Sequence, residues 1–187
     1  REFTQNCINY FEYQLQQKQI KVETHFNCTQ STFWFDADKM DKILFNLLSN
    51  AIKYTPNKGT INIEIKNQSL ATKANTTENH IIWTIKDSGI GIPENKLNSV
   101  FDRFTAANTG TYSDYSGTGI GLSIVKEFVE QHFGKIEIQS KSSTEADNKS
   151  FTQVTVTLPM NKSLFKPDDF AHQTDQETTT ANLNNWM

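Results

Sequence analysis

Apolar and polar positions along this chain follow two periods, and each period predicts one kind of element. Apolar residues at helical spacing predict helices over residues 3–15, 38–54, 94–100 and 118–132. Alternating or short apolar runs predict strands over residues 20–26, 33–35, 61–66, 81–86, 135–140 and 151–158. The stretches 67–79 and 105–116 are polar, so we expect exposed loops there, the second of them mobile.

The helix over residues 38–54 is the most strongly marked element. Its apolar residues fall on one face, which consists of Met40, Leu44, Leu47, Leu48 and Ala51. Asp36 or Asp38 offers an N-cap, and Pro56 ends the helix. We therefore expect this helix to cover the hydrophobic core.

The order of the elements predicts the fold class. Successive strands often lack a helix between them, whereas a doubly wound parallel sheet needs a crossover helix between strands. We therefore expect an α/β protein, a two-layer α/β sandwich with a mixed sheet and helices on one face. One domain should span residues 1–160, and the polar residues 161–187 should form a linker or tail.

Composition and charge limit the classes of partner and the compartment that we expect for this chain. The net charge is −3 and no dense Lys/Arg patch is present, so we expect no nucleic acid partner. Cys7 and Cys28 do not make a disulfide framework and are expected to be buried thiols in a reducing compartment. No apolar run is long enough to span a bilayer, and no secretion signal is present. Because the chain starts without Met, we expect a piece of a longer protein. We also expect this piece to be monomeric.

Three polar residues of the helix over residues 38–54 could carry chemistry. Asn46, Asn50 and Lys53 are spaced i, i+4 and i+7, so they fall within a wedge of roughly 60°. A solvated helix face fits this stripe equally well, but such a face would usually carry better helix formers than Asn. An amide oxygen suits Mg²⁺ beside phosphate oxygens, and Lys53 could meet a phosphate.

Two glycine-containing segments extend this pattern. Asp87 follows an apolar strand and precedes Gly89 and Gly91, which fits either a plain turn or a carboxylate that accepts a hydrogen bond from the amine of adenine. The segment 117–122 opens a helix, whose N-terminus suits phosphate. Its Gly-x-Gly-x-Gly spacing differs from the dinucleotide fingerprint and from a P-loop, and the motifs of eukaryotic-type protein kinases are missing.

Taken in order, four segments resemble the N, G1, F and G2 boxes of the catalytic ATP-binding domain of bacterial sensor histidine kinases. The segments are residues 46–54, 87–93, 101–104 and 117–122. That domain has the Bergerat fold, which gyrase B, mismatch-repair proteins and a heat-shock chaperone share. The resemblance covers residues 1–159.

The resemblance also implies which residues form the site. Asn50 would bind Mg²⁺, Asn46 and Lys53 would face the phosphates of ATP as catalytic residues, and Asp87 would read adenine. The other residues implied to contact the nucleotide are Tyr54, Gly89, Gly91, Ile92, Phe104, Thr118, Gly119, Gly121, Leu122 and Thr152. Thr152 is the weaker match, because the family's usual preceding glycine is replaced here by residues 148–150.

One position favours a kinase over a hydrolase. Relatives that hydrolyse ATP carry a Glu one turn before the metal-binding Asn, and here that residue is Asn46, whose amide cannot act as a general base. The resemblance therefore implies a protein-histidine kinase domain that binds ATP and Mg²⁺ and donates the γ-phosphoryl group. An anti-sigma-factor serine kinase and a nucleotide-binding pseudokinase of the same fold are the alternatives.

The acceptor of the phosphoryl group is expected outside this chain. The four histidines, His25, His80, His132 and His172, lack the His-Glu or His-Asp context of a phosphoacceptor, and we expect them to be structural or exposed. The expected partners are the dimerisation domain of the same kinase and the receiver domain of a response regulator. The domain itself should be cytoplasmic, in a parent anchored in the inner membrane. Residues after 159 could lead to a receiver domain, as in hybrid kinases, or form a disordered end.

The loop expected to cover the nucleotide departs from many relatives. No Lys or Arg lies between Arg103 and Lys126, where those relatives place a basic side chain. Mg²⁺, Lys53, Arg103 and backbone N–H groups would then have to balance the triphosphate. We expect weak nucleotide affinity or a mobile lid.

Overall fold

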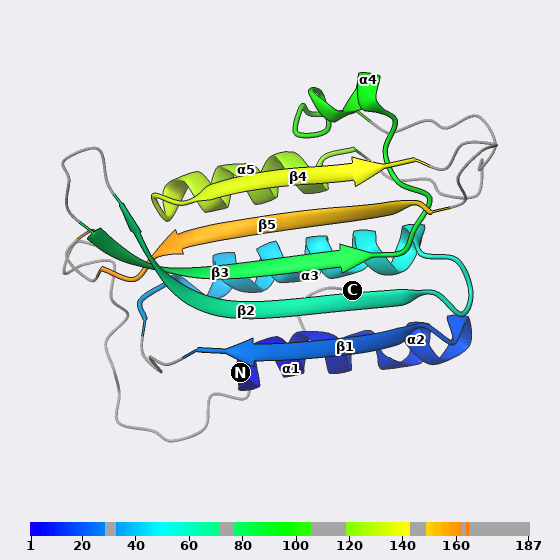
Figure 1. Ribbon diagram of the computed structural model, residues 1–187, viewed down its shortest axis with the longest axis horizontal. Coiled ribbons are helices and arrows are strands. Elements are labelled where there is room, and N and C mark those ends of the chain that lie inside the picture. The colour runs from blue at the N-terminus through cyan, green and yellow to red at the C-terminus, as the bar shows by residue number, and fades with distance from the viewer. Residues whose placement is uncertain (29–32, 72–76, 106–118, 143–148, 162–163, 165–187) are drawn as a thin grey trace.

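The computed structural model describes residues 1–28, 33–71, 77–105, 119–142, 149–161 and 164. One sheet forms the first layer, and helices that lie on one face of it form the second (Figure 1). The elements in chain order are α1 (Glu2–Tyr10), α2 (Glu12–Lys18), β1 (Lys21–Asn27), α3 (Ala37–Tyr54), β2 (Thr60–Ala71), β3 (Thr77–Asp87), α4 (Glu94–Leu97), α5 (Gly121–Gln131), β4 (Lys135–Lys141) and β5 (Phe151–Pro159).

The sheet is mixed, with strand order β1-β2-β3-β5-β4. The β1–β2 pair is parallel because α3 provides the crossover between them. The β2–β3, β3–β5 and β4–β5 pairs are antiparallel. The predicted two-layer α/β sandwich with a mixed sheet is therefore confirmed.

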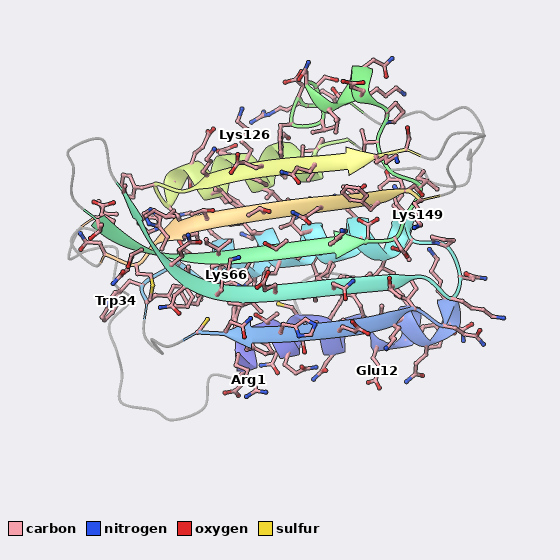
Figure 2. All side chains as sticks on the ribbon, in the orientation of Figure 1. Arg1, Glu12, Trp34, Lys66, Lys126 and Lys149 are labelled. Carbon is pink, nitrogen blue, oxygen red and sulfur yellow. The ribbon has the colours of Figure 1, made fainter. Side chains whose placement is uncertain are left out.

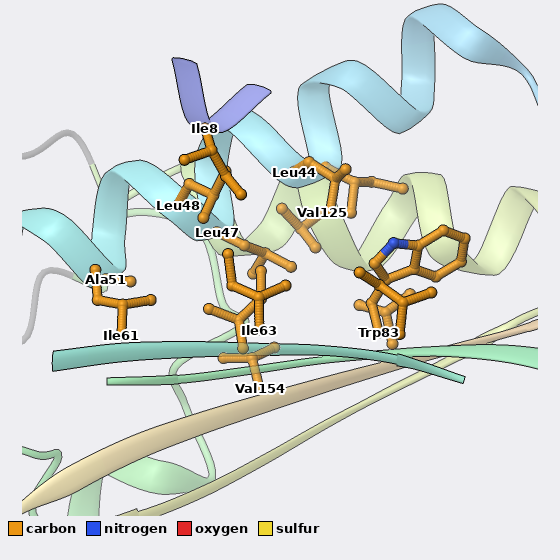
Figure 3. Packing of buried hydrophobic residues seen from close by; sticks show 14 of the residues in the cluster. Ile8, Leu44, Leu47, Leu48, Ala51, Ile61, Ile63, Trp83, Val125 and Val154 are labelled. Atoms are coloured by element: carbon orange, nitrogen blue, oxygen red, sulfur yellow. The ribbon is translucent and has the colours of Figure 1, made fainter. Parts of the chain in front are cut away.

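The hydrophobic core lies between α3, α5 and the inner face of the sheet. The predicted apolar face of α3 is buried throughout, and Leu44 retains 1% of its exposure. Figure 3 shows this face above Ile61, Ile63 and Val154 of the sheet, with Val125 of α5 beside it. Burial of this stripe is the main stabilising term for α3, since most helix stability in proteins comes from packing of an amphipathic face.

The opposite face of the sheet is polar. Figure 2 shows side chains such as Lys66 on this face, which none of the helices in the described part of the chain covers. Ion pairs there join residues two apart on one strand, as in Lys21–Glu23 at 2.6 Å and Lys135–Glu137 at 2.8 Å. These pairs are exposed, so each contributes little to stability.

The first turn of α3 is held by a side-chain cap and by a histidine. The Asp36 carboxylate accepts the backbone N–H of Lys39 at 3.0 Å, as one of the two expected caps. The backbone N–H of Asp36 in turn donates to Nε2 of His132 at 3.0 Å, and the ring's Nδ1 lies 2.7 Å from the Phe128 carbonyl oxygen. His132 is 2% exposed, so its role is structural, whereas His25 is an exposed strand residue.

Two polar or aromatic stretches differ from the prediction. Residues 67–71 and 77–79 are not a loop but continue β2 and β3, with Asn67 opposite Ile81 and Ala71 opposite Thr77. Backbone hydrogen bonds carry the hairpin past the core, although most of its side chains there are polar and Leu70 is only half-buried. Residues 33–35 form no strand, because the Phe33 ring instead packs against Trp83 at 5.4 Å and against Phe35 at 4.8 Å.

Other element boundaries shift for local reasons. The predicted helix over residues 3–15 is two helices that meet at Phe11, whose ring is buried against Phe45. The helix predicted over residues 94–100 ends at Leu97, and α5 begins at Gly121. Cys28 is exposed and Cys7 is half-buried, so the expectation of two buried thiols is wrong for Cys28.

The C-terminus of α2 carries a removable strain. Gln19 ends this helix in the left-handed conformation, at φ 53° and ψ 36°, which glycine adopts without a steric cost. We expect Gln19→Gly to raise the free energy of unfolding by about 0.5–1 kcal/mol, measured by urea denaturation. Gln17→Gly, inside the same helix, is the control and should lower it by about 1 kcal/mol; an equal loss in both variants would contradict the prediction.

Candidate nucleotide site

A cavity of about 370 Å³ opens where several elements end together. Its lining residues belong to the C-terminal half of α3, the start of α5, the loop after β3 and the neighbouring ends of β3, β5 and β4. The ends of these three strands lie at the same edge of the sheet (Figure 1). The residues that line it come from segments far apart in the chain, such as Asn50, Asp87, Leu122 and Thr152.

Two rows of side chains across β3, β5 and β4 form the floor of this cavity. Residues directly opposite on neighbouring strands point to the same face. In the polar row, Asp87 lies opposite Thr152, and Thr152 lies opposite Ser140. In the apolar row, Ile85, Val154 and Ile138 are opposite one another in the same way. The floor is thus apolar, with one polar edge, as a flat heteroaromatic ring with edge hydrogen-bonding groups would require.

Asp87 is the buried acid of the polar row, with 7% of its surface exposed. Burial raises the pKa of its carboxyl to about 6, against the opposing effect of hydrogen bonds from the backbone amides of Gly89 and Thr152. The Gly89 amide donates to Oδ1 at 2.8 Å. Near neutral pH the carboxylate is therefore ionised and available as an acceptor in a mostly apolar pocket.

The loop after β3 is shaped by glycines and held on both sides. A Cβ at Gly89 would come within 2.6 Å of the Tyr54 carbonyl oxygen, and one at Gly91, at φ +72°, would overlap the Lys141 carbonyl oxygen. The Ile90 amide donates to the Tyr54 carbonyl oxygen at 3.3 Å, and the Ile92 amide donates to Ser140 Oγ at 2.7 Å. Only glycine fits these two positions.

The polar stripe of α3 forms one wall. Asn46, Asn50, Lys53 and Tyr54 all line the cavity, so the structure brings together the residues that share a helix face in the sequence. Asn46 Nδ2 donates to the Lys42 carbonyl oxygen at 2.7 Å. Lys53 Nζ lies 5.0 Å from the centre of the Tyr54 ring.

The start of α5 forms the facing wall. Gly119 at φ +67°, Gly121 and Leu122 line the cavity, and a Cβ at Gly121 would lie 2.7 Å from Asn46 Oδ1. The first N–H groups of a helix lack intrahelical acceptors and carry the positive end of its dipole. The first turn of α5 contains no acidic residue, so it can receive an anion.

Some residues predicted from sequence lie elsewhere. Gly89 shapes the loop without lining the cavity, and Phe104 is 75% exposed and does not line it either. The Phe104 amide instead donates to the Gly119 carbonyl oxygen at 3.0 Å. Thr118 falls outside the described residues, and so do residues 106–116 of the loop expected to cover the nucleotide. Ile92, in contrast to Gly89 and Phe104, does line the cavity.

The structure also adds residues that sequence reasoning missed. Lys96 and Val100 line the cavity from the region of α4, and Ile85, Ile138 and Val154 form its floor. Lys96 supplies a second cation beside Lys53, whereas Arg103 is exposed and pairs with Glu127 at 3.5 Å. The sequence signal for the floor was strand alternation, but nothing in it marks Lys96.

The cavity lining carries both acidic and basic side chains. Among the described residues that line the cavity, Asp87 is the one acid, and Lys53 and Lys96 are the cations. No group of three or more His, Cys, Asp or Glu residues within the described part of the chain could hold a metal ion by itself. A divalent cation here would need oxygens from a ligand, with Asn50 as a neutral oxygen donor. In the described ranges, no helix is long and apolar enough to cross a bilayer.

Comparison with known proteins identifies the family. Residues 35–162 match the family model of histidine kinase-, DNA gyrase B-, and HSP90-like ATPases. The chain therefore belongs to this family, as an ATP-binding domain. It is similar to the sensor histidine kinase TmoS of Ectopseudomonas mendocina, with 45% identity over 55% of this chain and 10% of that protein.

Two further relatives agree with this assignment. The circadian input-output histidine kinase CikA of Synechocystis is 36% identical over 67% of this chain and 16% of that protein. The solved catalytic domain of histidine kinase ThkA, in a nucleotide-free form, has the same fold with a TM-score of 0.64 at 21% identity, covering 85% of this chain and 90% of that one. Within the ATPase family the chain is thus of the histidine kinase catalytic type. It spans at most about a sixth of the length of the two curated kinases.

Proposed function

We propose that this chain binds Mg-ATP and donates the γ-phosphoryl group to a histidine of a dimerisation domain outside this sequence, as the catalytic domain of a two-component sensor histidine kinase. The observation that carries the proposal is the buried Asp87 at the edge of an apolar floor, in one cavity with Lys53, Lys96 and the start of α5. This arrangement supports a base at the floor and phosphates at the cationic side.

The base is recognised by the floor of the cavity. The ring would pack on Ile85, Val154 and Ile138, and its exocyclic amine would donate to the Asp87 carboxylate. A purine with a carbonyl in that place would set an oxygen against the carboxylate, which favours adenine over guanine. The hydrogen bond between Gly89 and Asp87 orients the acceptor before the ligand arrives.

The negative charge of the phosphates is offset by two lysines, the N-terminus of a helix and a metal ion. Lys53, Lys96 and the first amides of α5 supply positive charge. Asn50 would hold Mg²⁺ by its amide oxygen, and the ion would neutralise phosphate charge when bound. Lys96 supplies part of the positive charge that was expected from Arg103.

The lining favours transfer over hydrolysis. Transfer requires a neutral imidazole nitrogen to attack the γ-phosphorus while the bond to the β–γ bridging oxygen breaks and ADP leaves with that electron pair. The second ring nitrogen then releases its proton to water or to a group of the dimerisation domain. Hydrolysis requires a general base for water. Asn46 cannot act as a general base. Asp87, the one acid among the described lining residues, is assigned to the binding of adenine.

The partners follow from this reaction. We propose that the dimerisation domain of the parent protein supplies the acceptor histidine, and that the receiver domain of a response regulator takes the phosphoryl group from it. A monomeric state for this chain, a cytoplasmic location and a parent anchored in the inner membrane stay predictions.

The test is phosphotransfer in a mixture of this chain, γ-labelled Mg-ATP and the separately purified dimerisation domain. We expect acid-labile, base-stable label on that domain, and none when its histidine is replaced by Gln. Acid-stable phosphoserine on a partner would support the serine kinase instead. ATP binding with no transfer to the dimerisation domain or to any other partner would support the pseudokinase.

A further inference from the structure

Ser140 has every hydrogen-bonding capacity of its hydroxyl group occupied. It accepts the backbone N–H of Ile92 at 2.7 Å and donates to the Phe151 carbonyl oxygen at 2.6 Å. A third contact, of 3.1 Å, joins its Oγ to Oγ1 of Thr152. A serine hydroxyl has one proton and two lone pairs, and a carbonyl oxygen can only accept. Ser140 therefore has a lone pair, and no proton, left for Thr152.

This assigns the proton of Thr152. Because Ser140 cannot donate to it, the Thr152 hydroxyl must donate to Ser140, and its remaining lone pairs are left for the cavity that Thr152 lines. Thr152 lies between Asp87 and Ser140 in the polar row. Two neighbouring groups, the Asp87 carboxylate and Thr152 Oγ1, then offer acceptors and no donor to a ligand.

We propose that Ser140 is a positioning residue that makes the polar edge of the pocket acceptor-only, so that it takes a purine with an amino group at that edge and rejects a purine with a carbonyl there. An exocyclic amine has two hydrogens, which two adjacent acceptors can share, directly or through a water molecule. A carbonyl oxygen has none for either. This inference rests on the proposed binding of ATP and assigns part of its base selectivity to a residue from β4.

A purely structural role for Ser140 makes a different prediction. In that role the hydroxyl only fastens the loop at Ile92 to the sheet, and its loss would weaken all nucleotides in proportion. In the proposed role its loss frees the Thr152 hydroxyl to rotate and donate into the cavity, which supplies the 6-carbonyl of ITP with a donor that the wild-type edge lacks. The ratio of the affinities for ATP and ITP, which differ at the 6-position, separates the two roles.

The experiment is calorimetric titration of Mg-ATP and Mg-ITP at pH 8 into the wild-type chain and into Ser140→Ala. We expect wild-type protein to prefer ATP strongly, and Ser140→Ala to reduce the ATP-to-ITP affinity ratio about three- to tenfold, the effect of one hydrogen bond. Ser140→Thr, which keeps a hydroxyl on a strand, should restore the ratio. Ser69→Ala is the matched control, since the Ser69 hydroxyl donates to Asn79 Oδ1 at the exposed end of the hairpin and does not line the cavity.

Each outcome decides one question. A proportional loss of both affinities, with the ratio unchanged, overturns the positioning role. If Ser140→Ala does not fold, Ser140→Cys takes its place, because a thiol keeps the volume but bonds weakly; an unchanged ratio in that variant also overturns the proposal. Failure of the wild-type chain to bind ATP would instead overturn the nucleotide site itself.

Discussion

Asp87→Asn is expected to lower the affinity for Mg-ATP at least about 100-fold, which corresponds to about 2.7 kcal/mol. The variant replaces a buried carboxylate acceptor by an amide whose N–H₂ group would face the amine of adenine, so a charge-assisted hydrogen bond is lost and two donors oppose each other. Calorimetric titration of Mg-ATP measures the change.

Asp102→Asn is the matched control for this prediction. It removes the same formal charge from an exposed position that does not line the cavity. We expect its affinity to stay within about twofold of wild type, an effect below 0.5 kcal/mol. Comparable affinities for the two variants would show that Asp87 does not bind the base.

Without ligand, Asp87→Asn should be more stable than wild type. Burial raises the pKa of Asp87 to about 6, above its ordinary value of 3.8. Between about pH 4 and pH 6 the native state therefore binds more protons than the unfolded state, so the free energy of unfolding falls as pH rises through that window. Above that window, the ionised carboxylate costs the ligand-free fold about 3 kcal/mol.

Urea denaturation of both proteins across pH tests this sign. We expect the free energy of unfolding of Asp87→Asn to exceed that of wild type by about 3 kcal/mol at pH 8, and the difference to vanish below about pH 4. A difference that stays constant with pH would mean that the amide changes packing rather than removing a buried charge. A gain of stability together with a loss of ATP affinity would mean that Asp87 is retained for nucleotide binding at a cost to folding stability.

Lys18→Met is the second substitution with a large expected effect, and it acts far from Asp87 in the sequence. Lys18 Nζ donates to the carbonyl oxygens of Ile52 at 2.7 Å, Lys53 at 3.0 Å and Thr55 at 2.8 Å. These groups belong to the end of α3, whose last carbonyls lack intrahelical donors and carry the negative end of the dipole. We expect the free energy of unfolding to fall by about 2 kcal/mol, because three acceptors lose a charged partner.

The loss should reach the nucleotide site as well. The end of α3 contributes Lys53 and Tyr54 to the cavity, and the Tyr54 carbonyl oxygen anchors the Ile90 amide. We expect ATP affinity to fall about three- to tenfold, measured by calorimetry below the unfolding transition.

Lys21→Met is the control for the lysine substitution. The Lys21 side chain is 71% exposed and pairs with Glu23 on the polar face of the sheet, so both stability and affinity should stay near wild type. If Lys18→Met were as stable as Lys21→Met, the three hydrogen bonds at the helix end would contribute nothing measurable.

Much of the fold was predictable because its signals are local. The apolar stripe through Leu44 and Leu48 repeats at helical spacing, so α3 and its buried face could be inferred from the chain alone. The hairpin beyond Asn67 could not, because its pairing depends on backbone hydrogen bonds to a strand already anchored in the core. The run at Phe33 misled in the opposite direction, since aromatic residues pack as readily around Trp83 as within a sheet.

The sequence by itself determined most of the elements, the helix face that carries Asn46, Asn50 and Lys53, and the glycines that frame Asp87, because these depend on spacing along one segment. Only the tertiary structure decided that Ser140 and Thr152 stand beside Asp87, that Lys96 lines the same cavity, and that Phe104 lies outside it. Strand order β1-β2-β3-β5-β4 makes these neighbours. Strand order follows from how the whole sheet buries its inner face, and no single segment encodes it.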